Sequence, residues 1–378
     1  MHLRFRGLLS AIVFTALPSF LAAQDLEPTQ APSDDGPIGQ VTTRLAYNSE
    51  DEGVVGLGLR TDRLFGANQS LSLDVEATRD ATRLNFNYLN DALVGGTPRF
   101  GLRLFRNARG DGDVFPFDST VTGLVPRLTW PLGDRGSVSA FAMYSLGEIT
   151  DLGPTPSALI AADEGTQRSS AVGTEIKLRY PGSGGVLRDA DFGFDLAYGT
   201  TSRDHDYLRY AARLAMQYGL SDGNVVLRSQ LRVGAIDTQA GVSSIGDRYM
   251  LGDASIRGFA FGGFGPRDAA ANGVALGGNH FAVLRLDAQF PNAIGAAGGR
   301  FVPGIFVDAG SLWGLDDVAG GLAGTDPVDD SARLRAAAGL SLRILTDIGP
   351  VEIYAAHPFA RESYDRTQQF GLSFTGSF

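Results

Sequence analysis

The chain has 378 residues, a formal net charge of −10, a mean hydropathy of −0.01 and no cysteine. Without cysteine it has no disulfide, no thiolate nucleophile and no cysteine-bound metal, and its acidic balance argues against a nucleic-acid partner. A hydropathy near zero is compatible with a membrane β-barrel, because lumen-facing and lipid-facing residues alternate along each strand.

The first 23 residues are predicted to be a secretory signal peptide. A basic start precedes an apolar run from Leu8 to Leu17, and small residues place the cleavage before Gln24. This run is shorter than the roughly 20 apolar residues that a membrane helix needs, and no later segment reaches that length. An exported chain of this kind can reside in a membrane only as a β-barrel.

Residues 24–40 are rich in proline, aspartate and glycine and are predicted to be a short periplasmic tether, ahead of an outer-membrane barrel spanning 41–378. Apolar and polar residues alternate repeatedly in the barrel segment, as in Leu71-Ser-Leu-Asp-Val75. This alternation gives a strand one apolar and one polar face, so we predict an all-β fold, a sixteen-stranded antiparallel transmembrane β-barrel. The predicted strands are 38–47, 53–62, 70–79, 81–89, 98–106, 119–130, 136–148, 167–180, 190–203, 207–219, 225–235, 278–290, 300–312, 332–345, 350–358 and 367–378.

An even number of strands places both termini on the periplasmic side of the outer membrane. The same parity assigns short turns to that side and longer segments to the outside. The predicted turns are 64–68, 131–134, 221–224 and 347–349, and the predicted external segments are 107–118, 149–166, 236–277 and 313–331.

The end of the chain has the same two-faced pattern. Phe370, Leu372, Phe374 and Phe378 fall on one face of the last predicted strand, and glycine, serine and threonine fall on the other. A strand that closes a membrane barrel directs its apolar face to lipid and its polar face to the lumen. We therefore expect this face to contact outer-membrane lipids.

The external segment 236–277 is unusual because it is dense in apolar residues and glycine, above all in 249–266. Such a stretch would be costly to leave in water, so we expect it to fold back into the lumen. Within it, Ser255-Ile-Arg-Gly-Phe259 resembles the V-R-G-F/Y signature in the sixth external loop of the BamA/TamA outer-membrane assembly-factor superfamily. This superfamily, of bacterial surface antigen type, also includes the two-partner secretion transporters.

Further motifs resemble the same family in the same order. Gly277-Gly-Asn279 opens a strand that ends at Asp287-Ala-Gln-Phe-Pro291, and Phe306-Val-Asp-Ala-Gly310 and Gly349-Pro350 follow. The resemblance implies a barrel that inserts or assembles proteins, or translocates polypeptide, at the outer membrane. It also implies that the apolar face of the last strand is the signal by which the cell's assembly machinery recognises the barrel.

The resemblance further implies a weak seam between 38–47 and 367–378 that opens laterally. Family members normally carry periplasmic POTRA domains, which bind client polypeptides and partner lipoproteins, whereas only the tether 24–40 is expected ahead of this barrel. The resemblance is therefore to a barrel-only member. Its clients would be unfolded outer-membrane proteins, and a separate periplasmic partner would take the place of the POTRA domains.

Arg257 lies in the segment that is expected to fold inward, where a desolvated guanidinium needs a carboxylate partner. Alternation places both Asp308 and Asp287 on the lumen side of their strands. In the proteins that this chain resembles, the loop arginine pairs with acidic residues on these two strands, which favours such a lock over a solvated arginine near unrelated carboxylates. The candidate lock comprises Arg257, Gly258, Phe259, Asp308 and Asp287, supported by Phe306 and Gly310.

Two other functions stay open. In a passive or gated pore, the inward segment would only narrow a channel. An outer-membrane hydrolase would need a nucleophile beside a histidine, and His205 in Ser202-Arg-Asp-His-Asp206 offers the one external turn for such a pair. Because this sequence is also typical of a hydrophilic turn, we predict no catalytic residue and no enzyme.

We predict neither a metal site nor a cofactor. The histidines that follow the signal peptide lack the spacing of metal ligands. No helix follows the glycines of 262–265, so they are interpreted as close packing of backbone rather than a phosphate site. Asp326, Asp329 and Asp330 are interpreted as a solvated acidic loop rather than a cation site.

Overall fold

The computed structural model describes residues 39–48, 52–62, 68–91, 97–112, 114–182, 185–294, 300–346 and 349–377. The predicted signal peptide, Phe378 and all of the predicted tether except its last two residues lie outside these ranges. Those two residues belong to the first strand, which begins at Gly39.

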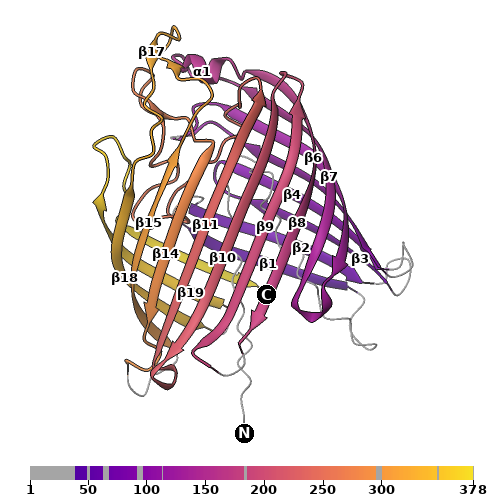
Figure 1. Cartoon of the computed structure of the whole chain (residues 1–378), viewed down its shortest axis with the longest axis vertical. Coiled ribbons are helices and arrows are strands. Elements are labelled where there is room, and N and C mark those ends of the chain that lie inside the picture. Colours follow the sequence, from indigo (N-terminus) through magenta and orange to yellow (C-terminus); the bar gives the residue numbers. More distant parts are fainter. Residues whose placement is uncertain are drawn as a thin grey trace.

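Sixteen antiparallel strands form one closed barrel, which confirms the predicted fold (Figure 1). The strands are β1 (Gly39–Asn48), β2 (Glu52–Asp62), β3 (Gln69–Ala77), β4 (Ala81–Asn90), β5 (Arg99–Arg109), β6 (Asp118–Pro131), β7 (Gly136–Thr150), β8 (Gly165–Pro181), β9 (Leu187–Thr201), β10 (Asp206–Leu220), β11 (Val225–Ala240), β14 (His280–Gln289), β15 (Phe301–Trp313), β18 (Arg335–Thr346), β19 (Gly349–Ala360) and β20 (Phe370–Ser377). Strands that are neighbours in the chain are neighbours in the barrel, and β1 closes on β20.

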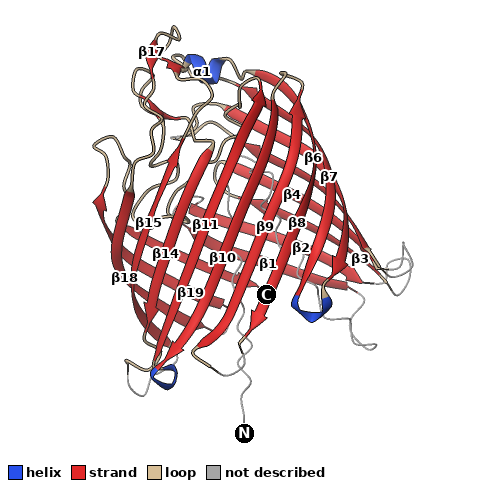
Figure 2. Cartoon of the chain, viewed as in Figure 1, coloured by secondary structure: helices blue, strands red, loops and turns tan. Residues whose placement is uncertain are grey.

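The long segments carry four further strands and a helix, and Figure 2 shows α1 and β17 at one end of the barrel. No periodicity predicted them, because strands of two residues have no period. They are helix α1 (Ala158–Ala161), β12 (Arg267–Asp268) paired with β13 (Val274–Ala275), and β16 (Ala319–Gly320) paired with β17 (Asp326–Pro327). Turns of 3-10 helix, η1 (Gly133–Arg135) and η2 (Ser221–Gly223), lie at the other end. In the part of the chain that the structure describes, no helix is long and apolar enough to cross a membrane.

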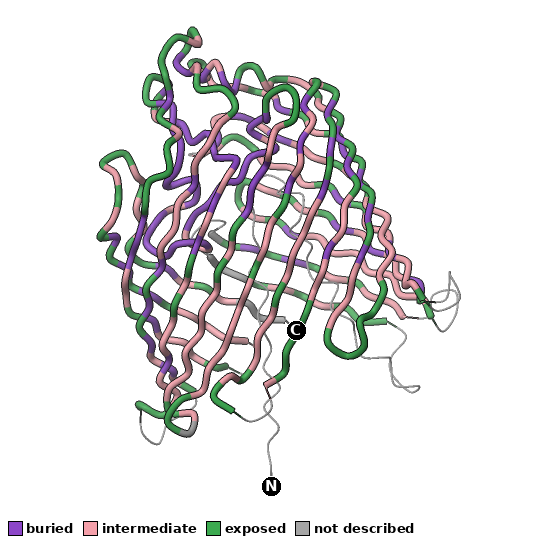
Figure 3. The backbone as a smooth tube through the Cα atoms, in the orientation of Figure 1, coloured by how far each residue is buried: buried purple, intermediate pink, exposed green. Residues whose placement is uncertain are grey.

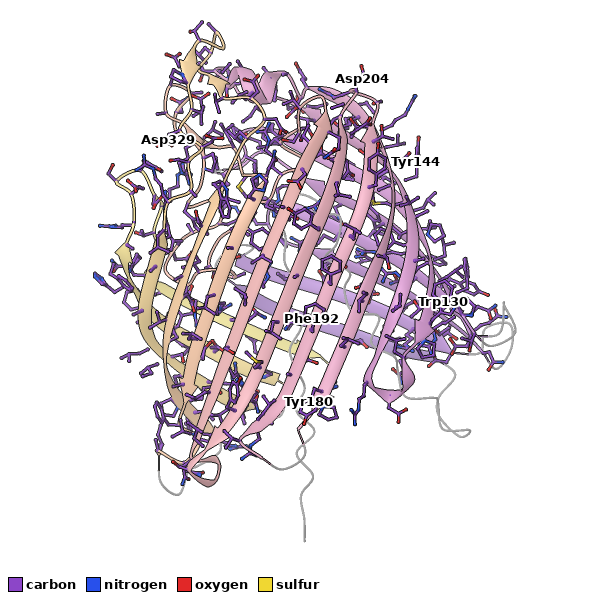
Figure 4. All side chains as sticks on the ribbon, in the orientation of Figure 1. Trp130, Tyr144, Tyr180, Phe192, Asp204 and Asp329 are labelled. Atoms are coloured by element: carbon purple, nitrogen blue, oxygen red, sulfur yellow. The ribbon has the colours of Figure 1, made fainter. Side chains whose placement is uncertain are left out.

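We call the end with the long segments the loop end and the other the turn end. Asp204 and Asp329 lie at the loop end in Figure 4, and Tyr180 lies near the turn end. Aromatic side chains such as Trp130 and Tyr180 are 37% and 45% exposed on the outer wall, where a barrel meets the membrane interface.

The alternation seen in the sequence separates the two faces of the wall. On β15, Ile305 and Val307 are 51% and 44% exposed, whereas Phe306 and Asp308 are almost fully buried. Apolar side chains therefore cover the outside of this strand, and the buried acidic side chain points inward, as its pattern predicts.

One strand is clearly longer than predicted. β11 continues to Ala240, although its alternation predicts an end at 235. The extra residues pair with β10, and the lumen-facing Ile236 is 2% exposed because inward-folded chain packs over it. The long segment that follows therefore begins at 241, and we call residues 241–279 the inner loop.

The inner loop and three other segments of the loop end, 114–117, 151–164 and 314–334, share a hydrophobic core. We call 151–164, which contains α1, the helix loop, and 314–334, which contains β16 and β17, the hairpin loop. Asp268 of the inner loop accepts hydrogen bonds from Ser157 Oγ at 2.6 Å and from the backbone N–H of Gly321 at 2.7 Å. Buried residues accordingly gather toward the loop end in Figure 3. The core includes Phe115, Phe117, Leu159, Ile160, Ile245, Met250, Phe261, Leu276 and Val328.

Closure of the barrel is the shortest part of its hydrogen-bonded ladder. Among the described residues, β1 pairs with β20 through 44–47 and 374–377, whereas the whole of β1 pairs with β2. We call the contact between β1 and β20 the seam.

Candidate functional site

The inner loop folds into the lumen and packs against the wall on the side of β10 to β18. Its residues Ile256 and Phe259 have no exposed surface, and Phe264 is 2% exposed. These side chains join lumen-facing residues of β10, β11, β14, β15 and β18 in one hydrophobic cluster, which includes Tyr207, Ile236, Phe281, Val283, Leu312 and Ala337. Burial of this apolar surface explains why the segment leaves water.

Arg257 makes a bidentate ion pair at the centre of this contact. Its Nε lies 2.7 Å from Asp308 Oδ2, its Nη2 lies 2.8 Å from Asp308 Oδ1, and its backbone N–H also donates to Oδ2 at 3.0 Å. Its Nη1 donates to Asp287 Oδ1 at 2.7 Å. The Arg257 side chain is 2% exposed and that of Asp308 is 0% exposed, so the geometry is that of a desolvated, doubly hydrogen-bonded pair.

Three further groups complete this cluster, and two of them were not named from the sequence. The guanidinium carbon lies 3.6 Å from the ring centre of Phe306, a close cation–π contact. Glu352 on β19 lies 3.8 Å from Arg257, and Arg285 on β14 lies 3.7 Å from Asp308. Alternation alone could have placed Glu352 and Arg285 in the lumen, but their depth beside Arg257 depends on the register of the strands.

Gly258 and Phe259 occupy positions that their neighbours tightly restrict. Gly258 has φ +96°, and a Cβ there would lie 3.1 to 3.3 Å from side-chain atoms of Ala356, Pro358 and Ala337. Glycine therefore meets both a backbone and a space requirement at this position. Phe259 packs edge-on against Phe264 with 5.3 Å between ring centres.

Gly310 of the supporting motif permits close approach of the neighbouring strand. A Cβ at this position would lie 2.5 Å from the carbonyl oxygen of Ala282 on β14. A larger residue would therefore displace β15 from β14, the two strands that carry Asp308 and Asp287.

The inner loop also pairs with the segment that leads into β20. Backbone N–H groups of Ala260, Arg366 and Gln368 donate to the carbonyl oxygens of Arg366, Gly263 and Gly258, at 3.0, 2.9 and 2.9 Å. The closing strand is therefore attached to the inner loop at its loop end, in addition to its ladder with β19.

The predicted terminal face is only partly described. Phe370 is 72% exposed, and Leu372 and Phe374 are half-buried. Phe378 lies outside the described residues. The pairing of β20 with both β19 and β1 makes this strand the last of the barrel.

His205 is not in a solvated turn, so the interpretation of 202–206 as a hydrophilic turn is wrong at this residue. Its side chain is 1% exposed, because the inner loop covers it and places Asp247 Oδ2 at 3.5 Å from Nδ1. Its other ring nitrogen, Nε2, lies 3.1 Å from Thr238 Oγ1.

Candidate metal ligands do not converge. Within the described ranges, no group of three or more His, Asp or Glu side chains could hold a metal ion. Asp329 pairs with Arg333, and Asp330 accepts the backbone N–H of Leu315 at 2.8 Å, so these acidic residues have hydrogen-bonding partners in their own loop.

Comparison with known proteins identifies the family. The model of the Omp85 superfamily domain matches residues 63–378. Among solved structures, the chain is similar to BamA from Haemophilus ducreyi lacking POTRA domains 1–3, with 17% identity, a TM-score of 0.75, and coverage of 91% of this chain and 71% of that one. It is also similar to CdiB from Acinetobacter baumannii (14% identity, TM-score 0.57, 91% and 60% coverage) and CdiB from Escherichia coli (14%, 0.55, 89% and 63%).

These likenesses have different weight. The solved structures are distant in sequence and show the fold alone, and the chain spans less than two thirds of the length of either CdiB chain. Omp85 barrels are outer-membrane proteins that insert or translocate proteins, and they are not enzymes. Because the family model matches most of the chain, this protein belongs to the Omp85 superfamily.

Proposed function

We propose that this barrel inserts or translocates polypeptide at the outer membrane through lateral opening of the seam, with both chain termini on the periplasmic side. The observation that carries the proposal is the short ladder of 44–47 with 374–377, since the ladder of β1 with β2 extends from Gly39 to Asn48. Because each lost ladder position removes backbone hydrogen bonds, the seam is the least costly place to open the wall.

The unequal lengths of the two seam strands leave part of β1 unpaired on one side. In the described residues, 39–42 pair with β2 but not with β20. An edge with free backbone donors and acceptors can accept an added strand, which is the chemistry that an unfolded barrel protein offers. This supports outer-membrane protein clients as the substrates, delivered by a separate periplasmic partner.

Occupation of the lumen supports a lateral route over a passive pore. The hydrophobic cluster of the inner loop fills space beside β10 to β18, and the lock of Arg257 with Asp308 and Asp287 holds it there. In this proposal, the lock keeps the lumen obstructed while the seam opens toward outer-membrane lipids.

A disulfide across the seam tests this function. The chain has no cysteine, and Ala46 and Thr375 are partners in the seam ladder, so Ala46→Cys with Thr375→Cys can form the cross-link. In lipid vesicles supplied with periplasmic extract, the oxidised double variant should lose insertion of an unfolded outer-membrane protein and regain it on reduction. Insertion is measured as heat-modifiable, protease-resistant client.

A matched control locks an interface that should not open. Thr43 and Leu57 are partners in the β1–β2 ladder, and the oxidised double cysteine variant there should retain full insertion. Full insertion with the seam demonstrably cross-linked would overturn the proposal. Equal ion conductance of oxidised and reduced seam variants, without any client insertion, would instead indicate a passive pore.

A further inference from the structure

His205 is a buried imidazole that lies where three parts of the loop end meet. It precedes β10, is 1% exposed, and its ring centre lies 5.1 Å from that of Tyr207. Nδ1 faces Asp247 of the inner loop at 3.5 Å, and Nε2 lies 3.1 Å from Thr238 Oγ1 on β11. The imidazole thus joins the barrel wall to the inner loop.

The hydroxyl of Thr238 indicates which nitrogen of the neutral imidazole carries the proton. We assign the neutral ring the tautomer protonated at Nε2, because Thr238 Oγ1 lies 2.9 Å from Asp316 Oδ2 as donor and can then accept from Nε2 of His205 at 3.1 Å. A neutral imidazole has only one N–H, so Nδ1 then faces the Asp247 carboxylate with a lone pair. Nδ1 has no hydrogen-bond partner among the described atoms.

Asp247 stays charged at this position. Burial raises the pKa of Asp247, but hydrogen bonds from protonated His205 and from Ser244 outweigh this effect, and the net pKa is below the ordinary value of an aspartate. Its carboxylate also accepts from Gln167 Nε2 on β8 at 3.2 Å and from the N–H of Ser244 at 3.2 Å. A fixed carboxylate therefore faces a basic nitrogen that lacks only a proton.

We propose that His205 is a proton-operated anchor of the inner loop: uptake of a proton on Nδ1 creates a charged hydrogen bond to Asp247 and fixes residues 243–248 to the barrel wall. When the proton leaves, an imidazole lone pair and a carboxylate face each other in a buried site, which weakens this attachment. The inference is independent of how the seam works.

A second carboxylate, that of Asp163, also stabilises the attachment of the inner loop at lower pH. Asp163 of the helix loop accepts the backbone N–H of Ile245 at 2.6 Å, and burial raises the pKa of Asp163 to about 6. Because a buried charge is lost when this group is protonated, the anchored state gains stability as the pH falls from above 6 toward 3.8. Other charged or titratable groups around the histidine are Arg203, Asp204, Asp206, Tyr207, Arg209, Asp237, Arg248 and Asp316.

Water can reach the site. A pocket of about 40 Å³ is lined by Asp163, Gln167, Ser244 and Asp247, and this volume is enough for a water molecule. Protons can therefore equilibrate with the carboxylates while the loop remains folded.

The mobility of a spin label beside residues 243–248 reports how firmly this part of the inner loop is attached to the barrel wall. Val242 is 47% exposed and adjoins the anchored residues, so Val242→Cys gives a single labelling site in this cysteine-free chain. The mobile fraction of the label should fall roughly threefold between about pH 8 and about pH 5.5. The measurement is made in an Asp163→Asn background, so that the remaining response belongs to the imidazole.

Two variants and a matched control decide the result. His205→Gln removes the titrating ring, and Asp247→Asn keeps the ring but removes its charged partner, so each should abolish the pH response. His357→Gln removes an exposed histidine of β19 and should leave the response unchanged. No response in the parent, or an unchanged response in both His205→Gln and Asp247→Asn with heat-modifiable barrels, would overturn the proposal.

Discussion

The wall formed by β10 and β11 and the seam formed by β1 and β20 show how one strand pattern produces ladders of different length. Every residue from Asp206 to Leu220 pairs across the first interface, whereas four residues of β1 pair across the second. All four strands alternate apolar and polar residues, so alternation gives no information about the strength of an interface. The number of ladder positions decides it.

The inner loop contributes unequally to these two regions. Its hydrophobic cluster and its ion pairs contact β10 to β19, and its backbone bonds to 366–368 reach the chain before β20. The inner loop therefore reinforces the wall at β10 to β19 from inside the lumen. The comparison teaches that barrel closure here depends on β20 being held by its other neighbours more than by β1.

Of the changes considered, removal of the lock should have the largest effect, because it weakens the contact of the inner loop with the wall at β10 to β19. Arg257→Ala removes the bidentate partner of the buried Asp308 and leaves only the longer contact with Arg285 at 3.7 Å, at an expected cost of up to roughly 3–5 kcal/mol. The midpoint of urea unfolding in detergent should fall, and protease should cut within 241–279. An exposed pair is the matched control: Arg333→Ala, which breaks contacts with Asp329 and Glu362, should leave both measurements unchanged. Equal behaviour of the two variants would contradict the lock.

Hydrogen exchange should rank the two interfaces directly. In the β1–β20 pair, the amides of 44–47 and 374–377 that point into the seam should exchange roughly a hundredfold faster than the amides that point between the strands of the β10–β11 pair, which corresponds to about 2.7 kcal/mol of opening free energy. Mass spectrometry of the folded barrel in lipid nanodiscs provides the rates. Equal protection of both pairs would show that the short ladder does not make the seam weaker.

The apolar face of β20 should affect assembly more than folded stability. Phe374→Ala removes half-buried apolar surface beside the seam, with an expected loss of about 1–2 kcal/mol and a reduced yield of folded barrel in the outer membrane. Ser373→Ala on the other face of the same strand is the control and should assemble normally. The proposed assembly signal would be refuted by equal heat-modifiable barrel for both variants.

Mild pH changes should have the smallest effect, and it should be confined to the loop end. Since the folded-state pKa of Asp163 is raised to about 6, its contribution to stability falls as the pH rises from 3.8 through 6. Asp163→Asn should remove this part of the pH dependence of protease resistance in 241–250. A variant with the same pH profile as the parent would exclude Asp163 as its source.

Much of the barrel was predictable because strand alternation is a local property. The two faces of β15 and the inward direction of Asp308 follow from residues two apart in the chain, and both were correctly predicted. The need of Arg257 for a carboxylate partner was equally local, because it follows from an apolar, glycine-rich segment that must leave water.

The tertiary structure alone decided which groups meet at a given depth. Glu352 joins Arg257, 366–368 pairs with the inner loop, and Asp247 covers His205, although each pair is far apart in the sequence. Such contacts depend on strand register and on the path of a long loop, neither of which has a period in the sequence. The sequence by itself determined the sixteen strands and their two faces, while the short seam and the groups around the inner loop were decided by how the closed barrel brings distant segments together.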